Sequence, residues 1–441
     1  MARHFDSSAP DFAQRFADFL AEPRGATEDL VGTVQTIIET VKAKGGSAVA
    51  DYTAEYDRLA LDPVFLVSDN VDLHRLAGAC SQELRDVIDL AHDRIAAYAE
   101  KQVPEDNYWK DATGVELGWR WVGLESVGVY VPGGQASYPS SVLMNVVPAK
   151  VAGVERVVMV APAPGGQLSP AVAYAAIRAG VDEYYPIGGA QAVAALAFGA
   201  GRIKPVHKIV GPGNAYVAEA KRQVFGTVGI DTIAGPSEIL VIADVTANPE
   251  WVAADLLSQA EHDPSSQSIL ISLDTELAIK VVEAVERQLS SLSTEARARK
   301  SWETHGAVVL AGSRAQAADL CNQIAPEHVE LCIADAGEMV PSIQHAGAIF
   351  LGHYTPEALG DYITGSNHVL PTSGAARFSS GLGVYDFMKR ISVQRASEES
   401  LMALAPVSYT HLRAHETRHD LVCRLLLEKK QSTSLVKKPN A

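Results

Sequence analysis

The chain has 441 residues, of which 47% are apolar and 20% are charged, a balance that allows more than one hydrophobic core. A formal net charge of -16 at pH 7 argues against nucleic acid and anionic membranes as partners, so we favour a small molecule. No apolar run approaches the ~20 residues of a membrane-spanning helix, and the four cysteines form no CxxC pair. We therefore predict a cytoplasmic protein with reduced thiols.

The N-terminal part is predicted to be mainly helical, and the next part to alternate strands with helices. From about residue 27 to residue 100, apolar residues recur at helical spacing, and Gly45 and Gly46 mark a point where a helix should end. After Trp121, β-branched runs alternate with Ala-rich stretches, which is typical of βαβ units. The predicted strands of this series are 127–131, 154–160, 183–187 and 208–210.

Glycine- and proline-rich turns follow these strands, at 132–134, 162–164, 188–189 and 211–214. Open α/β sheets bind ligands at the carboxyl ends of their strands, where glycine lets backbone N–H groups approach a nucleotide. The turns therefore predict a cofactor edge. A further series of strands, at 238–242, 268–271, 307–310, 330–333 and 348–351, predicts a second α/β sheet.

A helix that begins near Asn248 would present Gln259 and His262, three residues apart, on one face. Pairs at this spacing are a common way for a helix to hold a metal ion. Any amphipathic helix produces the same spacing on its solvated face, and spacing alone favours that interpretation.

Glu327 and His328 follow Pro326, which should end the preceding helix and leave both side chains at a helix-to-strand junction. A carboxylate beside an imidazole offers a group that activates water and a group that accepts a proton. The alternative is an exposed polar turn, which the local pattern alone favours.

Asp361 would lie in the second turn of a short helix capped by Thr355, with Pro356 at its first position and His368 just beyond its end. In that position, Asp361 either completes a metal site or interacts favourably with the dipole of its own helix. The sequence contains no GxGxxG, P-loop, HExxH or GxSxG motif, so local motifs alone leave the reaction open.

Six blocks, taken in order, resemble the histidinol dehydrogenase family from about residue 25 to about residue 400. They are 129–134 (VYVPGG), 211–217 (GPGNAYV), 234–238 (AGPSE), 259–263 (QAEHD), 326–330 (PEHVE) and 365–372 (GSNHVLPT). The resemblance implies an α/β homodimer in which each subunit has two Rossmann-like sheets. The implied divisions are an N-terminal extension (1–24), a first domain with the metal and catalytic residues (25–131 and 237–382), a second domain on the NAD side (132–236) and a shortened dimer-swapped segment (383–406).

The resemblance also implies that L-histidinol is oxidised twice, through an enzyme-held aldehyde, to L-histidine, with two NAD molecules reduced. Gln259, His262 and Asp361 match the positions that hold one Zn²⁺ per subunit, which orients the substrate. His328 matches the general base, and Glu327 matches the residue that activates water to hydrate the aldehyde.

The remaining implied contacts concern substrate and cofactor. The substrate positions are Ser237, Gln259, His262, His328, Asp361 and His368. The NAD positions are Tyr130, Gln191 and Asn214. Two other enzymatic functions remain open, a related zinc and NAD dehydrogenase of another small alcohol and a zinc hydrolase that uses Glu327 and His328 without NAD.

From about Val407 the chain departs from the family. The segment 407–441 has seven Lys or Arg against three Asp or Glu, in contrast to the acidic remainder, and resembles translated sequencing-adapter DNA. In the family this end supplies a glutamate and a zinc-binding histidine to the partner subunit. We do not assign a metal site to His411, His415 and His419, and we expect weak metal binding, or a folded but inactive protein, for the chain as written.

Overall fold

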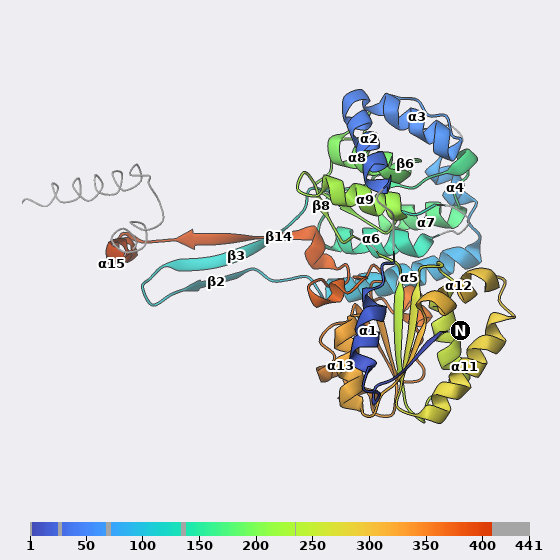
Figure 1. Ribbon diagram of the computed structural model, residues 1–441. Helices are drawn as coiled ribbons and strands as arrows, with labels where there is room; N and C mark the ends of the chain where they lie inside the picture. Colours follow the sequence, from blue (N-terminus) through green and yellow to red (C-terminus); the bar gives the residue numbers. More distant parts are fainter. Residues whose placement is uncertain (1, 25–28, 68–71, 134–137, 234, 408–441) are drawn as a thin grey trace, which may run out of the picture. The chain divides into compact units, whose positions relative to one another are not determined.

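The structure is a computed structural model that describes residues 2–24, 29–67, 72–133, 138–233 and 235–407. The chain forms two compact units, of which the first comprises Met1–Val103 and Gly123–Met388 and the second comprises Pro104–Val122 and Lys389–Ala441. The first unit contains two parallel sheets with helices on both faces (Figure 1). The predicted fold class is therefore confirmed.

The five-stranded sheet has the order β6-β5-β4-β7-β8. Its strands are β4 (Ser126–Tyr130), β5 (Arg156–Val160), β6 (Glu183–Tyr185), β7 (Lys208–Val210) and β8 (Gly229–Ile230). β4 is buried along its whole length, as expected for a central parallel strand. The helices of this part are α2 (Asp29–Lys44), α3 (Gly46–Asp57), α4 (Leu73–Gly78), α5 (Gln82–Glu100), α6 (Pro139–Val151), α7 (Pro170–Ala179), α8 (Gly189–Phe198) and α9 (Ala215–Val224).

The six-stranded sheet has the order β1-β11-β10-β9-β12-β13. Its strands are β1 (Arg3–Asp6), β9 (Glu238–Ala243), β10 (Gln267–Ser272), β11 (Ala307–Leu310), β12 (His328–Cys332) and β13 (Ala348–Leu351). α10 (Pro249–Ala260), α11 (Thr275–Leu289) and α12 (Glu295–His305) pack on one face. α1 (Phe12–Ala21) and α13 (Arg314–Ile324) pack on the other, and α14 (Glu357–Tyr362) follows β13 (Figure 1).

Both sheets wind in the same way. In each, the two strands that follow the central strand along the chain are added outward on one side of it, β5 and β6 beside β4, or β10 and β11 beside β9. The chain then returns to add strands on the other side. This is the doubly wound order of Rossmann-like folds. The six-stranded sheet takes β1 from before the other sheet and its remaining strands from after it, so it is discontinuous in sequence.

Three elements belong to a different sheet from the one that the expected domain divisions imply. β4 was placed in the first domain, yet it pairs with β5 and β7 at the centre of the five-stranded sheet. The apolar stripe of α2, which includes Val34 and Val41, packs in the core of that same sheet rather than the other. β1, expected in a separate extension, pairs in parallel with β11 because the edge of the six-stranded sheet offers it free hydrogen-bonding groups.

The second unit contains a small sheet of order β14-β3-β2, formed by β2 (Asn107–Lys110), β3 (Glu116–Gly123) and β14 (Met388–Arg395). β2 and β3 form an antiparallel hairpin, and α15 (Glu398–Val407) follows β14. Every residue of β2 is exposed, as are Leu401, Met402 and Leu404 of α15. The expected segment 383–406 thus includes a sheet strand and a helix, while the tail 408–441 lies outside the described residues.

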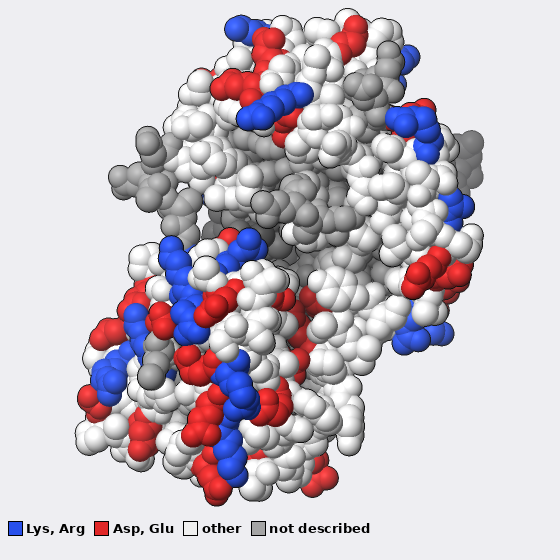
Figure 2. All heavy atoms as spheres, turned by 90° about the vertical axis from the view of Figure 1, so that its right-hand side faces the viewer, with Lys and Arg blue, Asp and Glu red and all other residues white. Residues whose placement is uncertain are grey.

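Where α11 and α12 lie, acidic and basic side chains are interspersed rather than separated by sign (Figure 2). Among the described residues, no helix has both the length and the apolar character needed to cross a membrane.

Candidate active site

A cavity of about 240 Å³ opens within the first unit. The turn Gly211–Gly213, which follows the carboxyl end of β7, lines the cavity. His328, the first residue of β12, lines it as well. The sequence-predicted residues Ser237, Gln259, His262, Glu327, His328, Asp361 and His368 all line this one cavity. Residues that lie far apart in the sequence are therefore brought together.

His328 is held in one orientation by the backbone of Glu238. Its Nδ1 lies 2.9 Å from the carbonyl oxygen of Glu238, which can only accept, so Nδ1 carries a hydrogen. In the neutral ring, Nε2 is consequently the acceptor. It is buried, has no hydrogen-bond partner among the described residues, and lies 3.4 Å from Oδ1 of Asp361.

Glu327 is also held in place by the backbone of Glu238, the first residue of β9. Its Oε2 accepts a hydrogen bond of 2.9 Å from the backbone N–H of Glu238, so one residue orients both Glu327 and His328. Burial raises the pKa of Glu327 to about 8, although His328 and the hydrogen bond from Glu238 oppose the shift. Burial alone would lower the pKa of His328, but the nearby carboxylates, Glu327 first among them, raise it well above its usual value.

Glu357 is an acidic residue of the site that the sequence did not single out. Together with His328 and Asp361 it forms a group whose ligand atoms all lie within 4.8 Å of one another. Its Oε2 accepts from Ser258 Oγ at 2.9 Å, and its backbone N–H donates to Oε1 of Glu330 at 2.7 Å. The signal that could have found it is its four-residue spacing from Asp361, which puts both carboxylates on one face of α14.

The donor set fits a metal ion. Gln259 is fully buried, yet neither its Oε1 nor its Nε2 has a hydrogen-bond partner within the described ranges. A buried amide without partners is costly unless a ligand satisfies it. The side chain of Asp361 is 12% exposed and lines the same cavity. The two unpartnered amide atoms of Gln259 are therefore consistent with a ligand at this site, such as a cation held by oxygen and nitrogen donors.

Two local expectations need correction. His262 lies beyond the end of α10, which stops at Ala260, because the helix ends in a tight turn at Glu261. The side chain of His262 is exposed but still lines the cavity. Thr355 is not the cap of α14, since Pro356 holds that position and the Thr355 hydroxyl donates to the carbonyl of Leu351 instead.

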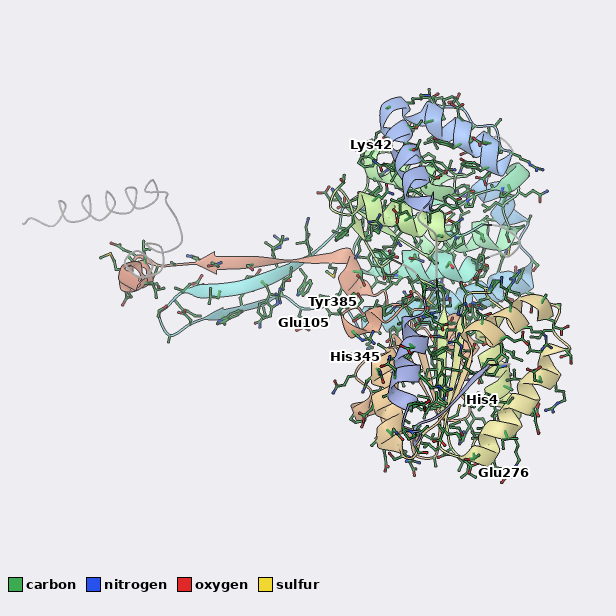
Figure 3. The ribbon with its side chains drawn as sticks, viewed as in Figure 1. His4, Lys42, Glu105, Glu276, His345 and Tyr385 are labelled. Carbon is green, nitrogen blue, oxygen red and sulfur yellow. The ribbon has the colours of Figure 1, made fainter. Side chains whose placement is uncertain are left out.

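His368 and Ser237 stand at the wall of the cavity. Nδ1 of His368 lies 3.0 Å from the backbone oxygen of Asp361, and burial lowers the pKa of His368, which favours its neutral form. His345, to which the sequence assigned no role, is not among the residues that line the cavity and lies beside α13 (Figure 3).

The three residues expected at the NAD positions lie at the carboxyl edge of the five-stranded sheet. Tyr130 ends β4, and its hydroxyl accepts from the backbone N–H of Gly189 at the start of α8. Gln191 is buried, and its Oε1 has no partner in the part of the chain that the structure describes. Asn214 caps α9 by accepting from Val217 N.

Comparison with known proteins identifies the family of this chain. The histidinol dehydrogenase family matches residues 20–417. The chain belongs to the histidinol dehydrogenase family. It is 54% identical to histidinol dehydrogenase 1 of Trichormus variabilis over 91% of this chain and 92% of the relative, and 53% identical to histidinol dehydrogenase of Rhodopseudomonas palustris over 92% and 95%.

A solved structure agrees with the fold of this family member. The crystal structure of histidinol dehydrogenase from Elizabethkingia anophelis superposes with a TM-score of 0.89 at 34% identity, covering 97% of this chain and 99% of that one. The protein is therefore an enzyme of this family, and the cavity with Glu327 and His328 is its candidate active site.

Proposed function

We propose that the protein oxidises L-histidinol to L-histidine in two successive NAD-dependent steps, with the aldehyde kept in the cavity between them. The observation that carries the proposal is the arrangement of His328. Its Nδ1–H is fixed on a carbonyl, and its Nε2, which is the acceptor once the ring is neutral, lies 3.4 Å from Oδ1 of Asp361 in a cavity lined by carboxylates. Family membership at more than half identity supplies the substrate class.

In the first step, Nε2 of His328 takes the proton of the carbinol hydroxyl, and the carbinol carbon loses a hydride. Tyr130, Gln191 and Asn214 would hold NAD at the carboxyl edge of the five-stranded sheet, where it would supply the hydride acceptor. The alcohol thereby loses two electrons and two hydrogens and becomes the aldehyde. The cavity wall, including Ser237 and His368, keeps the imidazole and amino groups of the substrate in place.

In the second step, the carboxylate of Glu327 removes a proton from a water molecule as the oxygen of that water attacks the aldehyde carbon. The protonated Nε2 of His328 gives its proton to the aldehyde oxygen, so the hydrated aldehyde again carries a hydroxyl and a hydrogen on one carbon and the ring of His328 is neutral again. His328 then takes the hydroxyl proton while a second hydride leaves to a second NAD, which yields the carboxylic acid. Holding the aldehyde in the cavity until the second oxidation would keep this reactive intermediate from side reactions.

Gln259, His262 and Asp361 would hold the metal, which when bound supplies a Lewis acid that orients the two nitrogen-bearing groups of histidinol. His328 and Glu357 are also near enough to Asp361 to be considered as ligands. Because Nδ1 of His328 is occupied by Glu238, however, Nε2 would have to serve as both ligand and proton acceptor. We therefore assign Nε2 to proton transfer and the metal to the other three residues.

We further propose that the enzyme is a homodimer. The second unit exposes Tyr108, Trp109 and the apolar residues Leu401, Met402 and Leu404. Exposed aromatic and apolar side chains gathered on a small sheet and helix favour a protein partner, and the family resemblance favours a second copy of the chain. Sedimentation or light scattering tests this by mass.

Purified protein given L-histidinol and NAD should produce two NADH for each L-histidine formed. The chain as written and a chain with a relative's C-terminal segment after Pro406 should both be assayed, since the tail departs from the family. A product that forms without NADH would instead favour the hydrolase. NADH formed only from other small alcohols would favour a related dehydrogenase, and NADH from the repaired chain alone would show that the written chain is inactive.

The pH dependence should follow the protonation of His328. The nearby carboxylates raise the pKa of His328, so at lower pH the ring is charged and cannot accept a proton. We expect kcat/KM for histidinol to fall as pH drops and to rise into the alkaline range. Glu357→Gln removes one negative charge near Nε2, so this rising limb should move to lower pH. An unmoved limb in a variant with normal metal content would contradict the proposal.

Glu327→Gln should separate the two steps. We expect oxidation of supplied histidinaldehyde to slow by about 10²-fold or more, because the amide cannot take a proton from water. Oxidation of histidinol to the aldehyde, measured in a single turnover, should change by less than about 10-fold, since His328 remains. Glu276→Gln, at an exposed position on α11 (Figure 3), is the control. Equal losses in both steps would show that Glu327 is not specific to hydration.

A further inference from the structure

Lys221 and Asp231 form an ion pair deep inside the first unit. Lys221 lies on α9 and Asp231 follows β8, and their side chains are only 2% and 3% exposed. Buried ion pairs often add little net stability, because both charges lose their hydration. A pair buried this completely therefore requires a reason other than stability alone.

The ion pair hydrogen-bonds to both polar backbone groups of Gly211, the N–H and the carbonyl. Nζ of Lys221 donates to the carbonyl oxygen of Gly211 at 3.1 Å, and Oδ2 of Asp231 accepts from the N–H of Gly211 at 2.7 Å. Gly211 is thus fixed from both sides, at the point where β7 ends and the turn to α9 begins.

Gly211 also lies directly against the end of β4. Its φ is +110°, and a Cβ atom there would lie 2.1 Å from the carbonyl oxygen of Tyr130. No side chain fits there, so the turn packs directly against the end of β4. The turn continues through Gly213 to Asn214, which caps α9.

We propose that Lys221 and Asp231 are positioning residues that hold the 211–214 turn in the shape that receives NAD. This inference rests on the proposed function, because it requires NAD as the hydride acceptor. The two side chains line the cavity, and both hydrogen-bond to the backbone of Gly211, through which they act on the turn. The turn that they hold is the carboxyl-edge loop of β7, where a doubly wound sheet binds its nucleotide.

The test compares NAD binding and steady-state kinetics for Lys221→Met and for the double variant Lys221→Met with Asp231→Leu. The double variant removes both charges and so leaves no unpaired charge in the core. We expect both variants to raise the calorimetric Kd and the KM for NAD by about 10- to 100-fold. The KM for histidinol and the zinc content should stay within about twofold of the parent.

Lys208→Met is the matched control. Lys208 lies on β7, the strand that leads into the turn, and pairs with Asp386 at 3.0 Å, but neither residue lines the cavity. It should lower the melting temperature without changing the Kd for NAD. An unchanged Kd in both Lys221 variants would overturn the inference, as would parallel rises in KM for NAD and histidinol. A parent chain that binds no NAD at all would instead overturn the proposed function together with this inference.

Discussion

Replacing His328 with asparagine should lower kcat for histidinol oxidation by about 10²- to 10⁴-fold, the usual contribution of a general base. The asparagine amide can still donate to the carbonyl of Glu238, as Nδ1 of His328 does. It offers no acceptor where Nε2 now lies. The variant therefore keeps the local structure and removes only the group that takes the proton. Stopped-flow measurement of NADH formation gives the rate of the hydride step directly.

The zinc content of the same variant decides between two roles for His328. We expect it to be unchanged, because we assign the metal to Gln259, His262 and Asp361. If zinc is lost along with activity, Nε2 is a metal ligand and the proposed base is wrong. His345→Asn, at a position that does not line the cavity, should alter neither quantity and controls for the loss of an imidazole.

Much of the fold could be predicted from the spacing of hydrophobic residues along the sequence. Parallel strands that are buried on both faces consist of short runs rich in β-branched residues. Strands such as β7, β11 and β13 were therefore predicted with their observed bounds. The turn 211–214 was predicted as a ligand edge because glycine and proline directly follow a buried strand. That turn does line the cavity through Gly211–Gly213.

Pairing between distant segments was not predictable in this way. β1 is only four residues long, and its assignment to the six-stranded sheet depends on contacts with β11, about three hundred residues away. The position of β4 depends equally on its neighbours. A local pattern shows that a strand exists, but it does not show which sheet completes its hydrogen bonds.

The candidate site illustrates the same limit. Glu327 and His328 lie at the amino end of β12, whereas the rule for open sheets directs attention to carboxyl ends. The two sheets contribute opposite edges to one cavity, and only the tertiary structure reveals this. Glu238, whose backbone orients both side chains, does so through its N–H and carbonyl, which every residue possesses. No residue type in the sequence could have marked that role.

Replacing Asp361 with alanine should lower zinc affinity by at least about 100-fold and reduce oxidation of histidinol to a comparable extent. Loss of an outer partner of a metal ligand already costs about 10- to 100-fold, and Asp361 is assigned as a ligand itself. The loss should be visible in zinc content after dialysis, measured by atomic absorption. Because Asp361 also lies 3.4 Å from Nε2 of His328, loss of activity alone would not identify its role.

Gln259→Leu resolves that ambiguity, because Gln259 makes no hydrogen bond to any described residue and its amide atoms lie buried at the cavity. If Gln259, His262 and Asp361 hold the metal, this variant loses zinc as Asp361→Ala does, while leucine fills a similar volume and preserves the fold. If the metal is held by His328, Glu357 and Asp361, zinc content is retained in Gln259→Leu and lost in Glu357→Gln. The two variants therefore give opposite results under the two ligand sets, and retained zinc in Gln259→Leu would contradict the set proposed above.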